Sequence, residues 1–430
     1  NQCDGSAGNG AGGGGIYFGD GTTLSALGCY FANNTTTNLD ASGGEFEYGG
    51  GMRAGNVGLT MLNCVFTNNY ALDDGGGMYV YASVGTQTHL VSNCTFVVNT
   101  ANGSGGGFVI VDGDYMAVYN CGFTNNIANT WGGGGFYVGG TFASTVVTNC
   151  SFENNDCDNY GGGAYLGNGT NLVIRNCVFY NNDAADRDAP DNSEQGGALY
   201  IGNPNLVMMD CVFTNNSTTN DQGGAVYAAG GNGVTFGFTN CTFRGNRSSG
   251  SDGGGVYIAD GALLSVSGCT FVTNYADNSG GGMLFNQAST ADNPPITFVN
   301  CIFSNNVARR GDAGGAYVAG NFAAAVVTNC QFYTNRCDNY GGGMRFASGT
   351  SLTVVDSSFY GNTATNQDGA PENYERGGGF YADNGNLTVL NCPFLNCQAD
   401  DDGGGFFAAG AGTETRTISN CVFVADIVGG

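Results

Sequence analysis

The chain has 430 residues, 78 of them Gly, and its 35 acidic residues outnumber 11 basic ones to give a net charge of −24. The Gly residues follow no Gly-X-Y period, which excludes collagen, and the negative charge disfavours nucleic acid and anionic membranes as partners. No apolar run reaches the roughly 18 residues of a transmembrane helix, so we expect no membrane insertion.

A unit of about 30 residues recurs along the chain, and one clear copy begins at Asn63. It starts with Asn-Cys-x-Phe-x-x-Asn at 63–69, continues through a loop to Gly-Gly-Gly at 75–77, and ends in the apolar strand 78–80. The Cys of the unit recurs at 29, 64, 94, 121, 150, 177, 211, 241, 269, 301, 330, 392 and 421. Ser357 holds the place of a missing Cys, and Cys3 resembles a degenerate first copy.

Each unit is expected to form one solenoid coil of three short strands. Apolar residues alternate before the Cys, as in Leu59 and Met61, and after the glycines, as in Val256 and Ile258, which is the period of a β-strand. Gly triplets and Asn pairs disfavour helical repeats. The pattern predicts an all-β fold, a right-handed parallel β-helix (solenoid) of about 14 coils of about 30 residues, in a single domain over 1–430.

A longer period lies over the coils. The segment of about 141–205 returns at about 321–387, an offset of about 180 residues, which corresponds to six coils. Both copies contain a long loop, with Ala189-Pro190 in the first and Ala370-Pro371 in the second. We interpret this as an internal six-coil duplication.

Residues at equivalent places of successive coils should stack at the strand spacing of about 4.8 Å. The Phe of the unit should form a buried column, the Asn a ladder of amides in a turn, and the Gly triplet a corner with positive φ or close backbone contact. The Cys column is best explained by small buried side chains. In-register disulfides would be strained, and neither Cys-x-x-Cys nor a nearby His supports a metal site.

Three cysteines stand outside the Cys column. Cys157 and Cys337 replace an Ala of the unit, seen at Ala71, so their neighbours on adjacent coils are not Cys. Any disulfide would have to form within a coil, and the candidate pairs are Cys150 with Cys157, Cys330 with Cys337, and Cys392 with Cys397.

The outward position after the glycines is mostly Tyr. One interpretation is an aromatic ladder that stabilises its sheet, and the other is an exposed stripe that stacks on glycans or contacts a neighbouring chain. The stripe consists of Tyr17, Tyr79, Tyr137, Tyr165, Tyr200, Tyr227, Tyr257, Tyr317 and Tyr381. Arg53, Val109, Leu284, Arg345 and Phe407 interrupt it.

The two signatures of the unit resemble the repeats of chlamydial polymorphic outer-membrane proteins and related bacterial surface right-handed β-helix proteins. Phe66…Asn69 and Phe213…Asn216 match the Phe-x-x-Asn of that family, and 223–226, Gly-Gly-Ala-Val, approaches its Gly-Gly-Ala-Ile. The resemblance covers nearly the whole chain, although most copies here have Gly-Gly-Gly. It implies an extracellular or cell-surface location and an adhesive or structural role.

Acidic residues are the main candidates for chemistry, and they lie in the loops before the glycines. They recur with the coil at Asp73-Asp74, Asp158, Asp252, Asp338 and 400–402, and the single His, His89, stands apart from them. A catalytic site would interrupt the repeat, as paired carboxylates do in glycosidases, so we expect no catalytic, cofactor-binding or metal-binding residue and no enzyme. Binding of Ca²⁺ by these loops is an alternative to plain solvation.

The chain begins inside a repeat at Asn1-Gln2-Cys3 and ends on the glycines that open the next unit. This pattern favours a subunit that stacks head to tail with itself into an extracellular filament, although a fragment of a longer solenoid would look the same. The expected joint contains Cys3, Cys421, Phe423, Ile427, Gly429 and Gly430, with Cys421 near Cys3. The alternatives are an adhesin stalk or passenger domain that binds glycans or a host surface and, third, a polysaccharide-active enzyme.

Overall fold

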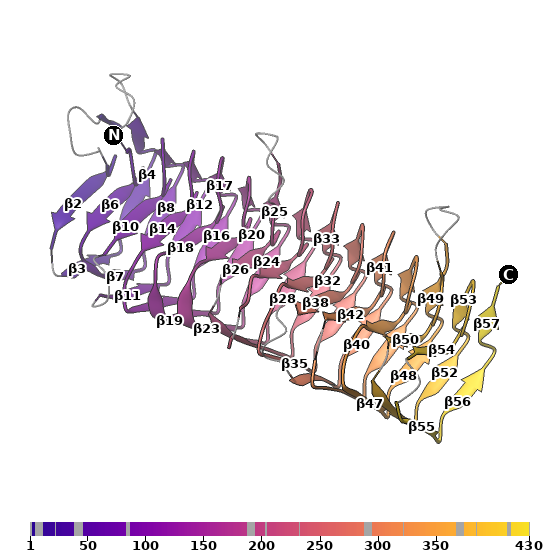
Figure 1. The fold of residues 1–430 in the computed structure, drawn as a ribbon. Helices are drawn as coiled ribbons and strands as arrows, with labels where there is room; N and C mark the ends of the chain where they lie inside the picture. The colour runs from indigo at the N-terminus through magenta and orange to yellow at the C-terminus, as the bar shows by residue number, and fades with distance from the viewer. Residues whose placement is uncertain are drawn as a thin grey trace. The chain divides into compact units, whose positions relative to one another are not determined.

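The computed structural model describes residues 2–4, 12–21, 23–37, 46–82, 87–186, 194–202, 204–231, 233–287, 295–320, 322–366, 374–383, 385–410 and 414–429. Within these residues the regular elements are β-strands, and no helix occurs (Figure 1). Contacts divide the chain into two compact units. Unit 1 comprises Asn1–Leu206 and Asn216–Thr219, and unit 2 comprises Val207–Asn215 and Asn220–Gly430. Each unit is a β-solenoid in its own right.

Each coil contains four strands, one more than the sequence suggested. One coil of unit 1 consists of β14 (Phe108–Val111), β15 (Tyr115–Tyr119), β16 (Gly122–Thr124) and β17 (Ile127–Ala128). One coil of unit 2 consists of β38 (Met283–Gln287), β39 (Pro295–Val299), β40 (Ile302–Ser304) and β41 (Val307–Ala308). The fourth strand was missed because two residues are too few to show a period of two.

Strands at the same place of successive coils pair in parallel, so each unit carries four sheets (Figure 1). We number these sheets first to fourth in the order of the four strands of a coil. In the first sheet, β14 pairs with β10 (Met78–Tyr81) on one side and β18 (Phe136–Gly139) on the other, without a register shift. The predicted parallel β-solenoid is therefore confirmed in both units.

The predicted Phe column fills the core behind the third sheet. In unit 1 the ring of Phe123 lies 5.0 Å from that of Phe96 and 4.8 Å from that of Phe152, centre to centre, with nearly parallel planes. In unit 2 Phe332 stacks in the same way on Phe303 at 5.1 Å and on Phe359 at 4.8 Å. These rings are buried, so the column removes a large apolar area from water in every coil.

The second Asn of the unit forms the predicted amide ladder, and the ladder is buried. Asn306 Nδ2 donates to Phe271 O and to Asn335 Oδ1, each at 2.9 Å. Asn306 Oδ1 accepts from the backbone and side-chain nitrogens of Asn274, each at 3.0 Å. The first Asn of the pair, such as Asn305 with φ 55°, takes the left-handed conformation that Asn tolerates better than most residues. One Asn therefore shapes the turn while the other bonds the coils together.

The Cys column joins coils through weak hydrogen bonds. The Sγ of Cys64 donates to Leu62 O at 3.3 Å and lies 3.7 Å from Ala26 O of the preceding coil. Ser357 takes the same place, since its hydroxyl donates to Val355 O at 2.9 Å and accepts from Cys330 N at 3.1 Å. Serine thus replaces cysteine without loss of the hydrogen bonds.

None of the candidate disulfides is formed in this structure, where the cysteines of the described residues whose side chains are placed are all free thiols. Cys157 packs against Ala128 and Ala184 inside the fourth sheet, and Cys337 takes the same place in unit 2. Cys150 and Cys330 instead lie in the Cys column, where their thiols donate to Thr148 O and Thr328 O. The two cysteines of each candidate pair thus lie in different columns. This also holds for the last candidate pair, Cys392 and Cys397.

Cys397 lies in neither the Cys column nor the fourth sheet. It stands in the Asn ladder, where Asn362 Nδ2 lies 4.0 Å from its Sγ and its backbone N donates to Asp426 Oδ1 at 2.8 Å. Cys392, in the Cys column, bonds to Leu390 O. The ladder therefore continues through a Cys and an Asp in place of two Asn residues.

The glycines of the corner are required by close backbone contacts. Gly75 has φ 71°, and a Cβ on Gly76 would lie 2.4 Å from both Gly106 O and Thr100 O. Any side chain at Gly76 would therefore collide with backbone atoms. Both predicted reasons for the glycines, positive φ and close approach, are confirmed.

Candidate functional site

The outward column of the first sheet in unit 2 consists mostly of tyrosines. Its strands are β30 (Val226–Ala228), β34 (Val256–Ile258), β38, β42 (Ala316–Gly320), β46 (Met344–Phe346) and β50 (Phe380–Asp383). In register along them stand Tyr227, Tyr257, Leu284, Tyr317, Arg345 and Tyr381. A leucine and an arginine thus each stand between two tyrosines.

Arg345 is enclosed by aromatic rings and carboxylates. Its guanidinium carbon lies 5.0 Å from the ring centre of Tyr317, 4.7 Å from that of Tyr340 and 5.4 Å from that of Tyr381. The same guanidinium forms ion pairs with Asp312 and, at 2.9 Å, with Asp383. Since the three residues of these two ion pairs are largely buried, this cation is held by both charge and stacking.

Asp312 belongs to a set of carboxylates that lie just before the corner glycines. Its Oδ1 accepts from the backbone N of Tyr340 in the next coil at 3.2 Å. Burial raises the pKa of Asp312 to about 6, while Arg345 acts in the opposite direction. Asp252 is its equivalent two coils earlier, and its Oδ1 accepts from Ser279 N at 2.8 Å. Burial also raises the pKa of Asp252.

A hollow of about 380 Å³ opens beside Leu284. Tyr257 and Tyr317 lie at its two ends, Leu284 and Ala319 provide apolar surface, and polar side chains make up the rest. The polar lining consists of Asp252, Asn278, Ser279, Asn286, Arg310, Asp312 and Asn339. The Asp252 carboxylate of this lining can accept hydrogen bonds from a ligand.

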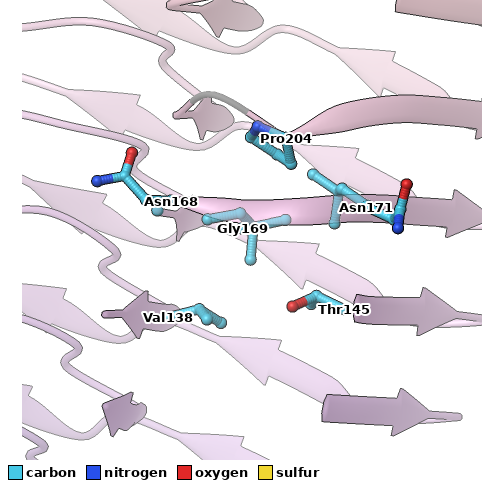
Figure 2. Close-up of a pocket in the computed structure, with 9 residues that line it drawn as sticks. Val138, Thr145, Asn168, Gly169, Asn171 and Pro204 are labelled. Atoms are coloured by element: carbon cyan, nitrogen blue, oxygen red, sulfur yellow. The ribbon is translucent and has the colours of Figure 1, made fainter. Parts of the chain in front are cut away.

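A second hollow in unit 1 is much smaller. Figure 2 shows Pro204 on one side of Gly169 and Asn171, with Val138 and Thr145 on the other side. Its volume is about 10 Å³, the space of a single water molecule. The larger hollow beside Leu284 is therefore the better candidate for a ligand.

The predicted exposed aromatic stripe is wrong for most of its length. Only Tyr17 is exposed, at 54%, among the stripe tyrosines of the described residues, whereas Tyr79, Tyr257 and Tyr381 are buried and the others are partly buried. The reason is that the rings cover one another, as Tyr165 does between Tyr137 at 4.5 Å and Tyr200 at 4.8 Å. The ladder interpretation describes these residues better.

The residues of the predicted joint fall in different columns. Cys3 lies in β1 (Gln2–Asp4) and pairs with Thr36, in the fourth sheet, whereas Cys421 precedes the third-sheet strand β56 (Val422–Val424). Cys3 is therefore not a first copy of the Cys column, and its proximity to Cys421 of a neighbouring copy stays a prediction. Phe423 and Ile427 are about half exposed, Gly429 bonds to Ala399 O, and Gly430 lies outside the described residues.

Sequence reasoning identified Tyr257 and Tyr317 but missed the rest of the hollow. The sequence shows Leu284 and Arg345 only as interruptions of the Tyr column. It groups Asp252 with the other acids that recur in the loops. The usable signal was the change from Tyr to Leu or Arg at a position that is otherwise aromatic. Arg310, Gly311 and Asp312 also line this hollow, and the carboxylate of Asp312 forms an ion pair with Arg345.

The described residues contain neither a metal-binding cluster nor a membrane-spanning helix. No three His, Cys, Asp or Glu side chains of that part of the chain are grouped so that they could hold a metal ion. Likewise, no helix within it has the length and apolar character needed to cross a membrane.

Comparison with known proteins agrees with the fold. A metabotropic glutamate receptor-like protein R of Dictyostelium discoideum is 28% identical over 180 residues, which is 38% of this chain and 10% of that protein. The match thus spans about a tenth of the relative's length. The family described as a right-handed β-helix region matches residues 88–271, 191–359 and 254–429, which together cover most of the chain. The narrower resemblance to the chlamydial proteins stays a prediction, and the chain belongs to the right-handed β-helix family.

Proposed function

We propose that the chain is a non-catalytic structural solenoid of an extracellular or cell-surface protein. The observation that carries this proposal is the use made of the corner carboxylates. Asp74 Oδ1 accepts from Ser104 N at 2.6 Å, and Asp401 Oδ2 accepts from Glu375 N at 3.1 Å, as Asp252 and Asp312 accept from backbone amides of the next coil. These acids hold one coil to the next, which is a structural role repeated along the chain.

A polysaccharide-cleaving role is less well supported. The right-handed β-helix family includes such enzymes, and they need an acid and a base or nucleophile set apart from the repeat. Here Asp312 is paired with Arg345, and the other corner acids bind backbone amides. His89 is buried in unit 1, and burial lowers its pKa to about 4. We propose that none of these groups performs acid–base catalysis.

Assembly end to end is the form of structural role that we favour. Phe423 stacks on Phe394 at 4.9 Å with one face and is 48% exposed. A further coil, from a second copy or from more of the same protein, would cover this ring and the apolar Ile427 and continue the parallel sheets. If the further coil belonged to a second copy, the two surfaces that meet would differ, so the contact would not close and would grow a filament.

The test is electron microscopy and sedimentation of the purified protein, with Phe423→Asp as the variant. We expect wild-type filaments or concentration-dependent growth, and a loss of both in F423D because a charge would be buried in the joint. Tyr360→Asp is the control, since Tyr360 is similarly exposed but lies on the side of a coil. Strictly monomeric wild-type protein, or filaments of unchanged length in F423D, would exclude head-to-tail assembly.

The structural role has a separate test in activity. Incubation with a panel of neutral and acidic polysaccharides should release no reducing ends and no unsaturated products. Turnover that survives repurification and is lost in Asp312→Asn or Asp252→Asn would show an enzyme instead. The hollow beside Leu284 favours recognition of a partner as a second function, which is the role expected of an adhesin.

A further inference from the structure

We propose that the hollow between Tyr257 and Tyr317 binds a guanidinium group, and that its natural ligand is an arginine side chain of a partner protein. This inference does not depend on the end-to-end assembly proposed above. It rests on a comparison of two neighbouring places of the same column, one of which already holds a guanidinium that the chain itself supplies.

The place with an internal guanidinium is that of Arg345. Tyr317 and Tyr381 stand one coil before and one coil after it, and its guanidinium carbon lies 5.0 Å and 5.4 Å from their ring centres. Rings two coils apart are separated by roughly 9.6 Å, twice the strand spacing. A flat cation therefore fits between two tyrosines of this column when the intervening coil contributes no ring.

The place of Leu284 has the same frame without the guanidinium. Tyr257 and Tyr317 stand one coil before and one coil after Leu284. The other face of Tyr257 is covered by Tyr227 at 5.5 Å, and the other face of Tyr317 by Arg345. The second face of each ring is turned toward Leu284, which stands in register between them and is 4% exposed, and the hollow of about 380 Å³ lies beside this leucine.

One of the two carboxylates has a counterpart, since Asp252 takes the place of Asp312, whereas Ala319 stands where Asp383 would be. Asp312, which pairs with Arg345, accepts from the backbone N of Tyr340, and Asp252 accepts in the same way from the backbone N of Ser279. At Asp252, the residue that corresponds to Arg345 is Leu284, and the side chain of Leu284 carries no charge. Burial dominates the raised pKa of Asp252, and Ser279 N and Asn278 act against it. An incoming guanidinium would supply the charge partner that Asp312 obtains from Arg345.

The remaining lining favours a donor-rich planar cation over other ligands. Asn278 and Asn286 line the hollow, and an amide oxygen can accept from one of the five N–H groups of an arginine. Arg310 is the opposing charge at the rim, but it is 54% exposed and lies 3.8 Å from Asp277. An ammonium lacks the flat face that stacks between rings, and a sugar ring would leave Asp252 without a counter-charge.

The experiment measures binding of N-acetyl-arginine methylamide to the full chain by nuclear magnetic resonance titration, with tyrosine and asparagine side chains labelled. We expect saturable shifts at Tyr257, Tyr317 and Asn286, which line the hollow. N-acetyl-lysine methylamide and methyl glucoside are the competing probes. Equal or tighter binding of the lysine probe or of the glucoside would overturn the assignment to a guanidinium.

Variants identify the site independently of the probe. Leu284→Arg places a guanidinium from the chain itself between the two rings and should abolish binding, while Leu284→Met, the matched control, should retain it. Asp252→Asn should weaken binding about tenfold, as the loss of a charge partner implies. Circular dichroism and melting temperature show whether each variant is folded. Undiminished binding by a folded L284R variant, or no saturable binding by wild type, would refute the proposal.

Discussion

Arg345 stands directly beside Tyr317 in the parallel register, with its guanidinium carbon 5.0 Å from the centre of that ring. The pair shows that the outward column accepts a flat cation as readily as an aromatic ring. A column of this kind stabilises the sheet by stacking, and its interruptions are the places where something other than packing can happen. Substitutions of the packing residues and of these interruptions should therefore have different effects.

Truncation of the Phe column should be severe. Phe332→Ala removes a buried ring that stacks on two neighbours, and we expect the free energy of unfolding to fall by about 3–5 kcal/mol. Urea unfolding measures this loss. Tyr360→Ala is the control, because that ring is 45% exposed and a surface change should stay within about 0.5 kcal/mol. Similar losses in both variants would contradict the assigned register.

The two asparagines of one turn should differ in their effects. Asn306→Ala leaves Phe271 O and the nitrogens of Asn274 without the amide that they bond, so we expect a loss of at least about 2 kcal/mol in unfolding free energy. Asn305→Gly should be neutral or slightly stabilising, because Asn305 has φ 55° and Gly adopts this conformation without strain. Equal destabilisation by the two changes would speak against the buried ladder.

The stability of unit 2 should carry a pH dependence from Asp312. Its pKa is raised to about 6 in the folded state, so the folded state binds this proton more tightly than the unfolded state does. The resulting stabilisation is fully present below about pH 4 and is lost as the pH rises through 6. In Asp312→Asn this component should vanish, which unfolding at a series of pH values measures. An unchanged profile in D312N would show that this carboxyl does not titrate in that window.

His89 should produce the opposite dependence in unit 1. Burial lowers its pKa to about 4, with the Asp112 backbone acting in the other direction, so protonation favours the unfolded state. The stability from neutral His89 is present above about pH 6.5 and is lost as the pH falls toward 4. His89→Gln should be less sensitive to acid than wild type over this range. Greater acid sensitivity in H89Q would mean that the buried imidazole is not the group responsible.

The thiols should be protected and unpaired. Cys337 is fully buried, and burial raises its pKa well above the usual value, while burial raises the pKa of Cys397 to about 11. Since the thiolate is the reactive form, neither should react with iodoacetamide in the native protein at pH 8, whereas the partly exposed Cys421 should. Mass mapping without reduction checks the pairing. A cross-linked peptide joining Cys330 to Cys337 would contradict the separate columns described here.

Much of the fold could be predicted because a solenoid repeats its requirements in every coil. The residue at Phe332 must match those at Phe303 and Phe359, and Asn306 must match Asn274, so the same letters return about every 30 residues. The glycines at the corner follow the same logic, since a Cβ at Gly76 would meet backbone atoms of two other strands or turns. Class of fold, strand direction and core composition were therefore readable from the sequence alone.

What only the tertiary structure decided depends on which side chain meets which across coils. The sequence shows that Leu284 and Arg345 interrupt a row of tyrosines. Only the register shows that Asp252 lies one coil before Leu284, as Asp312 lies one coil before Arg345. Likewise, the burial of Tyr257 comes from the stacked ring of Tyr227, and the column of Cys3 from its pairing with Thr36. Repeated positions are determined by local pattern, whereas a site is made from the exceptions, and their neighbours are determined only when the coils are stacked.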